Sequence, residues 1–567
     1  MSVDPFTLAA IHSSLIGVAR EMKITTMRTA YTQLWKEQGD LSCCLMDADG
    51  EICAQDPNGF PIHVTTMPLQ LQGALDRLGR DGLRPGDVII TNDPYIGGTH
   101  LPDVLIARPL FCDGVLYGFA CNRGHWADIG GMGPASYSPA TSDIHQEGLF
   151  IPPVKLFTAG EPSPGIMELV MSNVRNRAVG LGDLRAQYAS CETAERRLAG
   201  LIERVGLATL QAAMAEILRR SEDMTRERIA AFPDGTYAAR DCLDGDGLGP
   251  DPVWVDVRIT IQGSDIEVDL TGSSAQSAGG MNCSHSATAS AVQYAIKSIT
   301  DPDNPPNAGS YKPITIKTAK GTVVDVDAPG SIIGFGDVTY RVLDVTMKAI
   351  AEAIGDKAMA MGSGSTGTVV IAGRRGRAAG RAREGQFFTA LELSSGAYGA
   401  RMDRDGVSAM RYGPGNAGHI PIEADEMDNP LRFERYEITP DTGGAGRFRG
   451  GNGFVRAFRV LEKAQICLCA DRHLSHPQGL FGGLDGACAR YVLNPGESTE
   501  RELPSKTPYL NLEPGTLVHL QSAGGGGVGE PGTRAPDHVA EDLRNGYVSE
   551  AYALETYGHV PGPTTPD

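Results

Sequence analysis

The stretch TNDPYIGGTHLPD (residues 91–103), followed by NRGHWAD (residues 122–128), gathers imidazoles and carboxylates in two short segments. His100 and Asp103 lie three residues apart, and His125 follows the apolar run GVLYGFACN. Zinc, manganese and ferrous iron accept two imidazoles and one carboxylate, and three protein ligands leave coordination positions open for water or substrate. The pattern predicts a divalent-metal site, and its alternative is a group of turn residues and hydrogen-bonded histidines beside a sheet.

The sequence around these segments predicts a sheet with helices. GDVIITND (residues 86–93) and VLIARPLF (residues 104–111) are apolar strand candidates, so the three candidate ligands are expected on loops at strand ends. LSCCLMDADGEICAQ (residues 41–55) reads as a β-hairpin around an Asp/Gly turn. Helical periodicity over residues 5–31 and an alanine-rich, charged stretch over residues 182–232 predict one long helix and a pair of long helices.

The pattern further along the chain predicts three domains in a mixed α/β (α+β) fold. The turn at Pro233-Asp234-Gly235 ends a metal-bearing α/β domain at residues 1–235. A central α/β domain at residues 236–428 is expected to contain a hairpin in VWVDVRITIQGSDIEVDL and a helix after a loop of small residues. A β-rich, glycine-rich domain at residues 429–567 is expected to contain strands at FVRAFRVL, AQICLCA and TLVHLQS.

The amino-acid composition and net charge limit the classes of protein to which the chain can belong. The chain has 567 residues, 41% of them hydrophobic, which is enough for several large cores. The net charge of −19 opposes binding to nucleic acid, and the arginine-rich stretch at residues 373–385 reads as a solvated loop. Since no apolar run is long enough for a membrane span and Asp4 stands where a signal peptide would carry positive charge, a cytoplasmic location without membrane contact is expected. The eleven cysteines are scattered, as expected for reduced core residues.

Six motifs in order along the chain resemble the hydantoinase B/oxoprolinase family. They are TNDPYIGGTHLPDV, NRGHWADIGG, IHQEGLFIPPVKL, GDLRAQYAS, AGRFRGGNG and GGGGVGEP. Relatives that this resemblance brings in include the metal-bearing subunits of acetone and acetophenone carboxylases. In the acetone carboxylase relatives a His-x-x-Asp pair and a later histidine hold the metal. The resemblance implies that His100, Asp103 and His125 hold zinc or manganese here.

The resemblance also implies a division of labour between two subunits. The reactions of this family are driven by ATP, yet this chain has neither GxxxxGK[ST] nor a clear strand-GxGxxG-helix unit. Its glycine-rich segments at residues 443–453 and 522–531 are therefore read as tight turns that bring backbone segments together. A hydantoinase A-like partner with an actin-like fold is expected to bind ATP and to phosphorylate the substrate.

Other polar residues are candidates for supporting roles. His63 in PIHVTTMP and Asp128 are candidate general acid/base or bicarbonate-contacting groups. Asp93 is a candidate second carboxylate that orients a ligand histidine, with turn capping as the alternative. His145 is left outside the metal set, and Glu147 is expected to anchor a loop. A Cys-His or Ser-His pair around residues 283–285 lacks local support.

The expected function is that of the metal-bearing subunit of an ATP-dependent amidohydrolase acting on cyclic amides of the hydantoin or 5-oxoproline type. In this hypothesis the metal lowers the pKa of a water that attacks the activated carbonyl. The first alternative is a subunit of an ATP-dependent ketone carboxylase, in which the metal would orient a bicarbonate-derived group. The second alternative is a non-catalytic scaffold subunit.

Overall fold

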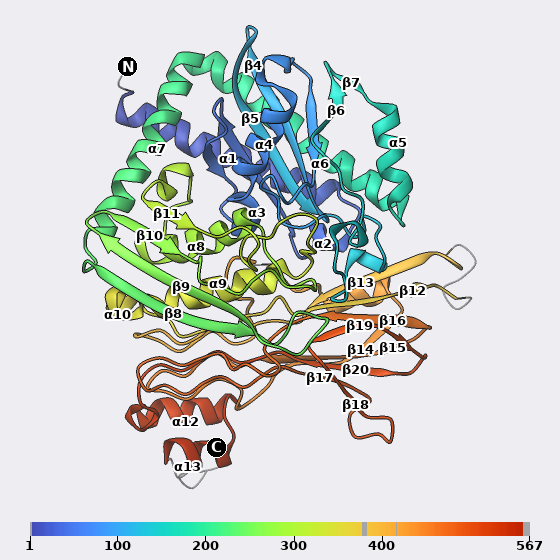
Figure 1. The fold of residues 1–567 in the computed structure, drawn as a ribbon, viewed down its shortest axis with the longest axis vertical. Coiled ribbons are helices and arrows are strands. Elements are labelled where there is room, and N and C mark those ends of the chain that lie inside the picture. The colour runs from blue at the N-terminus through green and yellow to red at the C-terminus, as the bar shows by residue number, and fades with distance from the viewer. Residues whose placement is uncertain (1–2, 377–382, 416, 559–567) are drawn as a thin grey trace, which may run out of the picture.

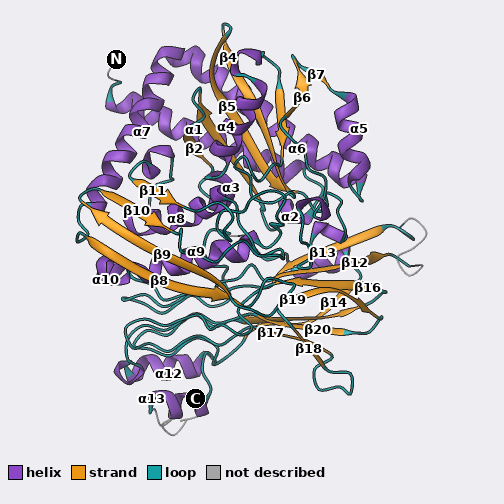
Figure 2. Ribbon diagram, viewed as in Figure 1, coloured by secondary structure: helices purple, strands orange, loops and turns teal. Residues whose placement is uncertain are grey.

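The computed structural model describes residues 3–376, 383–415 and 417–558, and Figure 1 shows their arrangement. Helices and four β-sheets are interspersed along the chain (Figure 2), which confirms the predicted mixed α/β class. The middle of the predicted arginine-rich loop, residues 377–382, lies outside the described residues.

A seven-stranded sheet carries the metal motif. Its strands follow the order β2-β1-β5-β4-β3-β6-β7, and each neighbouring pair is antiparallel. The strands are β1 (Leu41–Asp47), β2 (Ile52–Gln55), β3 (Val88–Thr91), β4 (Asp103–Cys112), β5 (Val115–His125), β6 (Val154–Thr158) and β7 (Glu161–Pro162). The predicted hairpin at residues 41–55 is confirmed as the antiparallel pair β1–β2.

Helices cover both faces of the central strands of this sheet. Cys43 and Leu45 of β1 belong to the core that includes α1 (Pro5–Thr29) and α6 (Arg177–Val205). Cys44 and Met46 point to the other face, where α4 (Met67–Leu78) packs. Since successive side chains of a strand point to opposite faces, burial of both faces explains why β1 is apolar from Cys43 to Met46.

The remaining helices of this part are α2 (Gln33–Lys36), α3 (Pro61–Val64), α5 (Pro164–Asn173) and α7 (Leu207–Ile229). Gly206, with a φ of 82°, separates α6 from α7, so the predicted pair of long helices is confirmed. Within the described ranges, no helix alone has the length and apolarity of a membrane span, and the pair α6–α7 meets that test only with a bend of 106°.

A four-stranded sheet with two buried helices forms the middle of the molecule (Figure 1). Its order is β11-β10-β9-β8, and α9 packs against β8, β9 and α8. The bounds are β8 (Gly235–Leu243), β9 (Val253–Gln262), β10 (Asp265–Asp269), β11 (Ile314–Lys317), α8 (His285–Thr300), α9 (Phe335–Ala349) and α10 (Ala351–Ile354). The hairpin expected in VWVDVRITIQGSDIEVDL is confirmed as the antiparallel pair β9–β10, and the helix expected after the loop of small residues is confirmed as α8.

Two further sheets share a core in the last third of the chain. One has the order β13-β12-β16-β19 and the other β14-β15-β20-β17-β18. The first contains β12 (Thr368–Arg374), β13 (Phe387–Leu393), β16 (Ala464–Cys469) and β19 (Lys506–Leu512); the second contains β14 (Leu431–Ile438), β15 (Phe454–Val460), β17 (Arg490–Leu493), β18 (Arg501–Leu503) and β20 (Leu517–Gln521). The short helices are α11 (Ile422–Asp428), α12 (Pro536–Arg544) and α13 (Glu550–Tyr557).

The first of these sheets joins strands from both sides of residue 428. β12 pairs with β16 in an antiparallel ladder from Thr368–Cys469 to Gly373–Ala464. Strands on both sides of the predicted boundary therefore share one sheet, and the division into three domains stays a prediction.

The glycine-rich segments pack backbone against backbone. A Cβ atom on Gly524 would lie 1.8 Å from the carbonyl oxygen of Thr442, and one on Gly450 would lie 1.9 Å from that of Gly525. Phe448 and Val528 form a bridge between the two segments. No side chain fits at these approaches, so the expected close packing of backbone segments is confirmed, whereas the expected tight turns are not found in residues 443–453 and 522–528.

A buried ionic network ties α9 to the neighbouring sheets. The Arg341 guanidinium lies 3.0 Å from Asp241 Oδ2 and 2.5 Å from Asp471 Oδ2. Arg472 Nη2 lies 2.7 Å from Asp344 Oδ2, and all of these side chains are buried. The network fixes α9, whose N-terminal turn forms one wall of the candidate site described next.

Candidate metal centre

The β4–β5 hairpin brings two of the predicted ligands together. Asp103 is the first residue of β4 and His125 the last of β5, and the two are direct partners in the antiparallel register. The hairpin reverses at Asp113–Gly114, where both residues have positive φ. Side chains opposite each other in such a pair lie on one face at close distance, so the hairpin explains the spacing of the two residues in the sequence.

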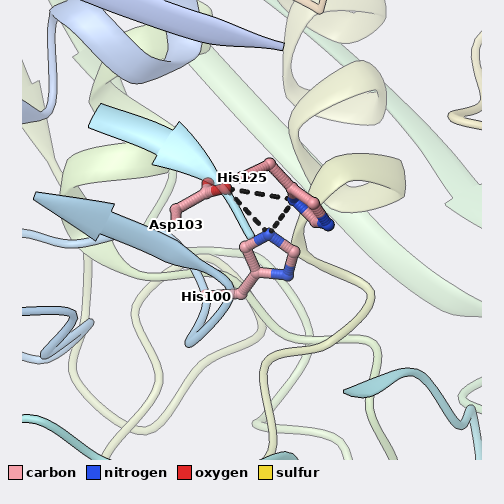
Figure 3. A group of neighbouring side chains, drawn as sticks. All are labelled: His100, Asp103 and His125. Carbon is pink, nitrogen blue, oxygen red and sulfur yellow. Dashed lines mark hydrogen bonds and ion pairs between the residues drawn. The ribbon is translucent and has the colours of Figure 1, made fainter. Parts of the chain in front are cut away.

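Three ligand atoms meet at this end of the sheet, as Figure 3 shows. His100 Nε2 lies 3.1 Å from Asp103 Oδ1 and 3.1 Å from His125 Nδ1. His125 Nδ1 lies 3.2 Å from the same Asp103 oxygen. All three side chains are buried. The structure thus brings together the three residues that the sequence predicts as metal ligands.

Protons alone cannot satisfy this triangle of contacts. A hydrogen bond from each imidazole to Asp103 Oδ1 requires a proton on both His100 Nε2 and His125 Nδ1, and those two protons would then face each other. Removing either proton leaves a nitrogen lone pair against the carboxylate oxygen. A cation at the centre accepts all three atoms, because bonds of about 2.1 Å place neighbouring ligand atoms roughly 3.0–3.4 Å apart. The donor set therefore fits a divalent metal ion.

The local electrostatics keep the carboxylate in the ligating form. Burial by itself would raise the pKa of Asp103, but the imidazoles of His100 and His63 outweigh it and hold that pKa well below its usual value. Burial lowers the pKa of His100. Burial also acts to lower the pKa of His125, but the hydrogen bond to Asp103 and the charge of Asp40 outweigh it and raise that pKa. An ionised carboxylate and neutral imidazoles are the forms that coordinate metals, so a metal ion would displace the proton that the raised pKa favours on His125.

Neighbouring groups fix the orientation of the ligands. The Thr99 hydroxyl donates to Asp103 Oδ2 at 2.5 Å. Trp35 Nε1 donates to the backbone oxygen of His125 at 2.7 Å, and the indole packs over Gly124. Partners of this kind hold a ligand in position and tune its affinity for metal.

His63 lies beside the triad, together with an aspartate that the sequence reasoning missed. His63 Nε2 is 3.3 Å from Asp103 Oδ2 and 3.7 Å from Asp40 Oδ1. Its Nδ1 is buried and has no hydrogen-bond partner among the described residues. Asp40 directly precedes β1, and its backbone oxygen accepts the N–H of His125. Only the pairing of β1 with β5, which the sequence does not specify, reveals this position.

The structure does not bring Asp93 or Asp128 into contact with the triad. The Asp93 carboxylate accepts the backbone N–H of Tyr95, which is a turn-capping contact. Asp128 accepts backbone N–H groups of its own loop and pairs with Arg175 at 2.8 Å. Within the described ranges, no hydrogen bond or ion pair joins either carboxylate to His100 or His125. The predicted role of Asp93 in orienting a ligand histidine and that of Asp128 in acid/base chemistry stay predictions.

The triad opens into a small cavity at the junction of the N-terminal sheet, α9 and the β12–β13 hairpin. The cavity has a free volume of about 60 Å³ and is lined by the triad, His63 and Asp40 on one side. Its other walls include Tyr137, Phe335, Tyr340, Leu391, Leu393 and Arg411. The ring centroids of His100 and Phe335 lie 4.6 Å apart. Most of these other wall residues are apolar. They lower the local dielectric constant and so strengthen electrostatic interactions inside the cavity.

Two other predictions concern residues outside the cavity. Glu147 Oε1 accepts the Ser331 hydroxyl and the N–H groups of Ile332 and Ile333, so it anchors the loop before α9 as expected. His285 Nδ1 contacts Thr318, and burial raises the pKa of Cys283 to about 12, which disfavours a nucleophilic thiolate there.

Comparisons with known proteins agree with this arrangement. The family model for hydantoinase B/oxoprolinase matches residues 4–531. A protein assigned as the B-type component of a D-/L-hydantoinase from Pseudomonas sp. strain NS671 is 31% identical over 98% of this chain and 95% of its own length. The caprolactamase β-subunit of Pseudomonas jessenii is 30% identical over 99% of this chain and 96% of its own length.

Two solved structures share the fold. The crystal structure of the ATP-dependent caprolactamase from Pseudomonas jessenii superposes with a TM-score of 0.91 at 28% identity and covers 100% of this chain and 98% of its own. An acetone carboxylase in its nucleotide-free form has a TM-score of 0.89 at 20% identity and covers 98% of this chain and 79% of its own, a likeness of fold alone. The match of the family model over nearly the whole chain and the identity to relatives of the same length establish that this protein is a member of the hydantoinase B/oxoprolinase family.

Proposed function

We propose that the chain is the metal-bearing subunit of an ATP-dependent amidohydrolase that opens cyclic amides of the hydantoin or 5-oxoproline type. The observation that carries the proposal is the mutual contact of His100 Nε2, Asp103 Oδ1 and His125 Nδ1, which a cation satisfies and protons do not. These three residues would hold zinc or manganese. A divalent metal held there would lower the pKa of a coordinated water and neutralise negative charge that develops on the substrate.

His63 is the residue of this chain best placed to move a proton. Its Nε2 faces the carboxylates of Asp103 and Asp40, which fixes the ring, while its Nδ1 has no partner among the described residues. Because an imidazole can release a proton from one nitrogen while the other stays bonded to a carboxylate, Nδ1 would serve as the general acid that protonates the leaving amide nitrogen. Asp40 acts by positioning this ring.

ATP would be bound by a second, hydantoinase A-like chain. Two relatives are named as subunits, one of a hydantoinase and the other of a caprolactamase, and the sequence of this chain has no GxxxxGK[ST] motif. The partner would transfer the γ-phosphoryl group of ATP to the amide oxygen and release ADP. In the cavity of this chain water would add to the activated carbon, the ring C–N bond would break as the nitrogen takes a proton, and a second water would release the phosphoryl group as inorganic phosphate.

The test is an assay of the chain purified together with its A-type partner. ATP hydrolysis and ring opening are measured with hydantoins, 5-oxoproline, lactams and ketones, with and without bicarbonate, alongside elemental analysis. Ring opening without bicarbonate and close to one metal per chain is the expected result. Turnover of a ketone that strictly requires bicarbonate would instead place the chain with the ketone carboxylases.

A variant of the triad can distinguish a catalytic role of the chain from a scaffold role. We expect His100→Ala to lose metal and turnover while the complex with the partner still forms on size-exclusion chromatography. Loss of the complex together with the metal would favour the scaffold function, and full metal content with full turnover would refute the site.

A further inference from the structure

A buried arginine that has no carboxylate partner in the described ranges lines the metal cavity. Arg411 has 6% of its surface exposed and lines the same cavity as the triad. Its Nε and Nη1 atoms are buried and have no hydrogen-bond partner among the described residues. An arginine side chain stays charged in proteins, and an unpaired buried charge is strongly unfavourable.

The four fully buried arginines of the described ranges each have ion-pair or hydrogen-bond partners at their guanidinium groups, although the Nε atom of each is among the buried atoms without a hydrogen bond. Arg456 lies 3.0 Å from a carboxylate oxygen of Glu392, and Arg341 and Arg472 belong to the ionic network of α9. Arg123 donates to three neutral acceptors, which are the backbone oxygen of His63 and the side chains of Thr66 and Gln70. Arg411 differs from these four, because both its Nε and its Nη1 lack a hydrogen-bond partner among the described residues and because it lines the cavity.

The surrounding residues hold Arg411 in place. The hydroxyl of the next residue, Tyr412, donates to Asp344 at 2.9 Å. The backbone oxygen of Pro414 accepts the N–H of Ile62, the residue before His63. The Tyr340 hydroxyl accepts a hydrogen bond from the guanidinium and donates weakly to the backbone oxygen of Gly415 at 3.4 Å. The backbone that follows Arg411 is thus tied to the segment that carries His63, and the guanidinium itself contacts Tyr340 of α9.

The cavity with a bound divalent cation would have a net positive charge, which an anionic ligand would neutralise. Asp40 and Asp103 contribute two carboxylates, whereas a divalent cation and Arg411 together contribute three positive charges. With neutral imidazoles and a neutral coordinated water, the cavity would hold one unbalanced positive charge, and protonation of His63, the form that acts as general acid, would add a second. A ligand that carries an oxyanion would neutralise this charge, and a planar guanidinium matches the oxygens of phosphoryl and carboxylate groups with two parallel hydrogen bonds.

We infer that Arg411 is the anion-binding residue of the metal cavity and that the ligand presented to the metal carries a phosphoryl or carboxylate group. This inference rests on the proposed metal centre. Arg411 would hold the anionic group while the reacting carbon faces the metal and His63, so it would select charged intermediates over the neutral cyclic amide.

The test measures anion binding to the full-length, metal-loaded chain by isothermal titration calorimetry. The probes are methylphosphonate for a phosphoryl group and acetate for a carboxylate. Arg411→Gln is expected to weaken binding of the preferred probe by about 10- to 100-fold, since a hydrogen bond to a charged group is lost. Arg411→Lys should retain part of the affinity, and Arg404→Gln, an exposed arginine of the same segment, should leave it unchanged.

Two controls separate the ways in which the inference can fail. Elemental analysis of the wild type tests the metal centre on its own, since absence of metal would refute the proposed function. Full metal content with equal anion affinity in wild type and Arg411→Gln, or no binding of either probe to the wild type, would overturn the role of Arg411.

Thermal unfolding of the ligand-free chain tests the competing structural role. Because Arg411→Met removes an unpaired buried charge, its melting temperature is expected to equal or exceed that of the wild type. A large decrease would show that Arg411 supports the fold rather than the ligand, and would overturn the inference.

Discussion

Substitution of Gly124 by alanine is expected to disturb the metal centre from the opposite face of β5. A Cβ atom at this position would lie 2.3 Å from Cζ2 of Trp35, whereas ordinary contacts begin near 3.4 Å. The indole would have to move by about 1 Å, yet it is fully buried and donates to the backbone oxygen of His125 at 2.7 Å. Overpacking costs about 1–3 kcal/mol and the strained hydrogen bond about 1 kcal/mol more.

We therefore expect Gly124→Ala to lower the free energy of unfolding by about 2–4 kcal/mol in a urea titration. Metal affinity, measured by competition with a chelator, should fall by about 10- to 100-fold, because the support of a ligand residue shifts.

Gly17→Ala is the matched control. Gly17 is an exposed residue of α1, and its added Cβ would meet nothing within 4 Å. Alanine in a helix should stabilise the chain by about 0.5–1 kcal/mol and leave metal affinity unchanged. Wild-type stability and metal affinity in Gly124→Ala would refute the reasoning that Trp35 holds His125 in place.

Three further perturbations test other parts of the structure. Asp103→Asn removes the only carboxylate of the triad, so chelator competition should show metal affinity lowered by more than about 100-fold; an affinity within about tenfold of wild type would contradict the site. Arg341→Met leaves buried carboxylates uncompensated and should cost about 3–5 kcal/mol in urea unfolding, whereas Arg219→Met, an exposed arginine of α7, should cost less than about 1 kcal/mol. Burial raises the pKa of Glu147 to about 7 from an ordinary 4.5, so the folded state keeps a proton that the unfolded state has lost. Stability should therefore fall as pH rises from 4.5 to about 7, by on the order of 3 kcal/mol, and Glu147→Gln should have a flatter profile; identical profiles for the two proteins would show that Glu147 does not titrate in this range.

Local patterns in the sequence predicted many of the elements correctly. The periodicity of α1, the turn of the β1–β2 hairpin and the alanine-rich, charged stretch of α6 and α7 depend on residues close in sequence, so they can be recognised without tertiary contacts. A further local signal, the Asp113–Gly114 turn, would have predicted that Asp103 and His125 face each other.

Side-chain direction within loops was not predictable in this way. Asp93 and Asp128 lie close to the ligands in sequence, yet the carboxylate of Asp93 accepts a turn N–H and that of Asp128 pairs with Arg175. An aspartate in a loop satisfies backbone donors whenever they are within reach, and the local sequence does not state which donors those are.

The sequence by itself identified the three candidate ligand residues and contains the turn of the hairpin that joins two of them, because side-chain chemistry and turn formation are properties of short segments. Only the tertiary structure decided which distant residues complete the cavity: Asp40 through the pairing of β1 with β5, Phe335 through the ionic network that holds α9, and Arg411 through the segment packed on α3. These contacts join residues far apart in the chain, and they form through strand pairing and through the packing of helices and sheets against one another, which no local pattern encodes.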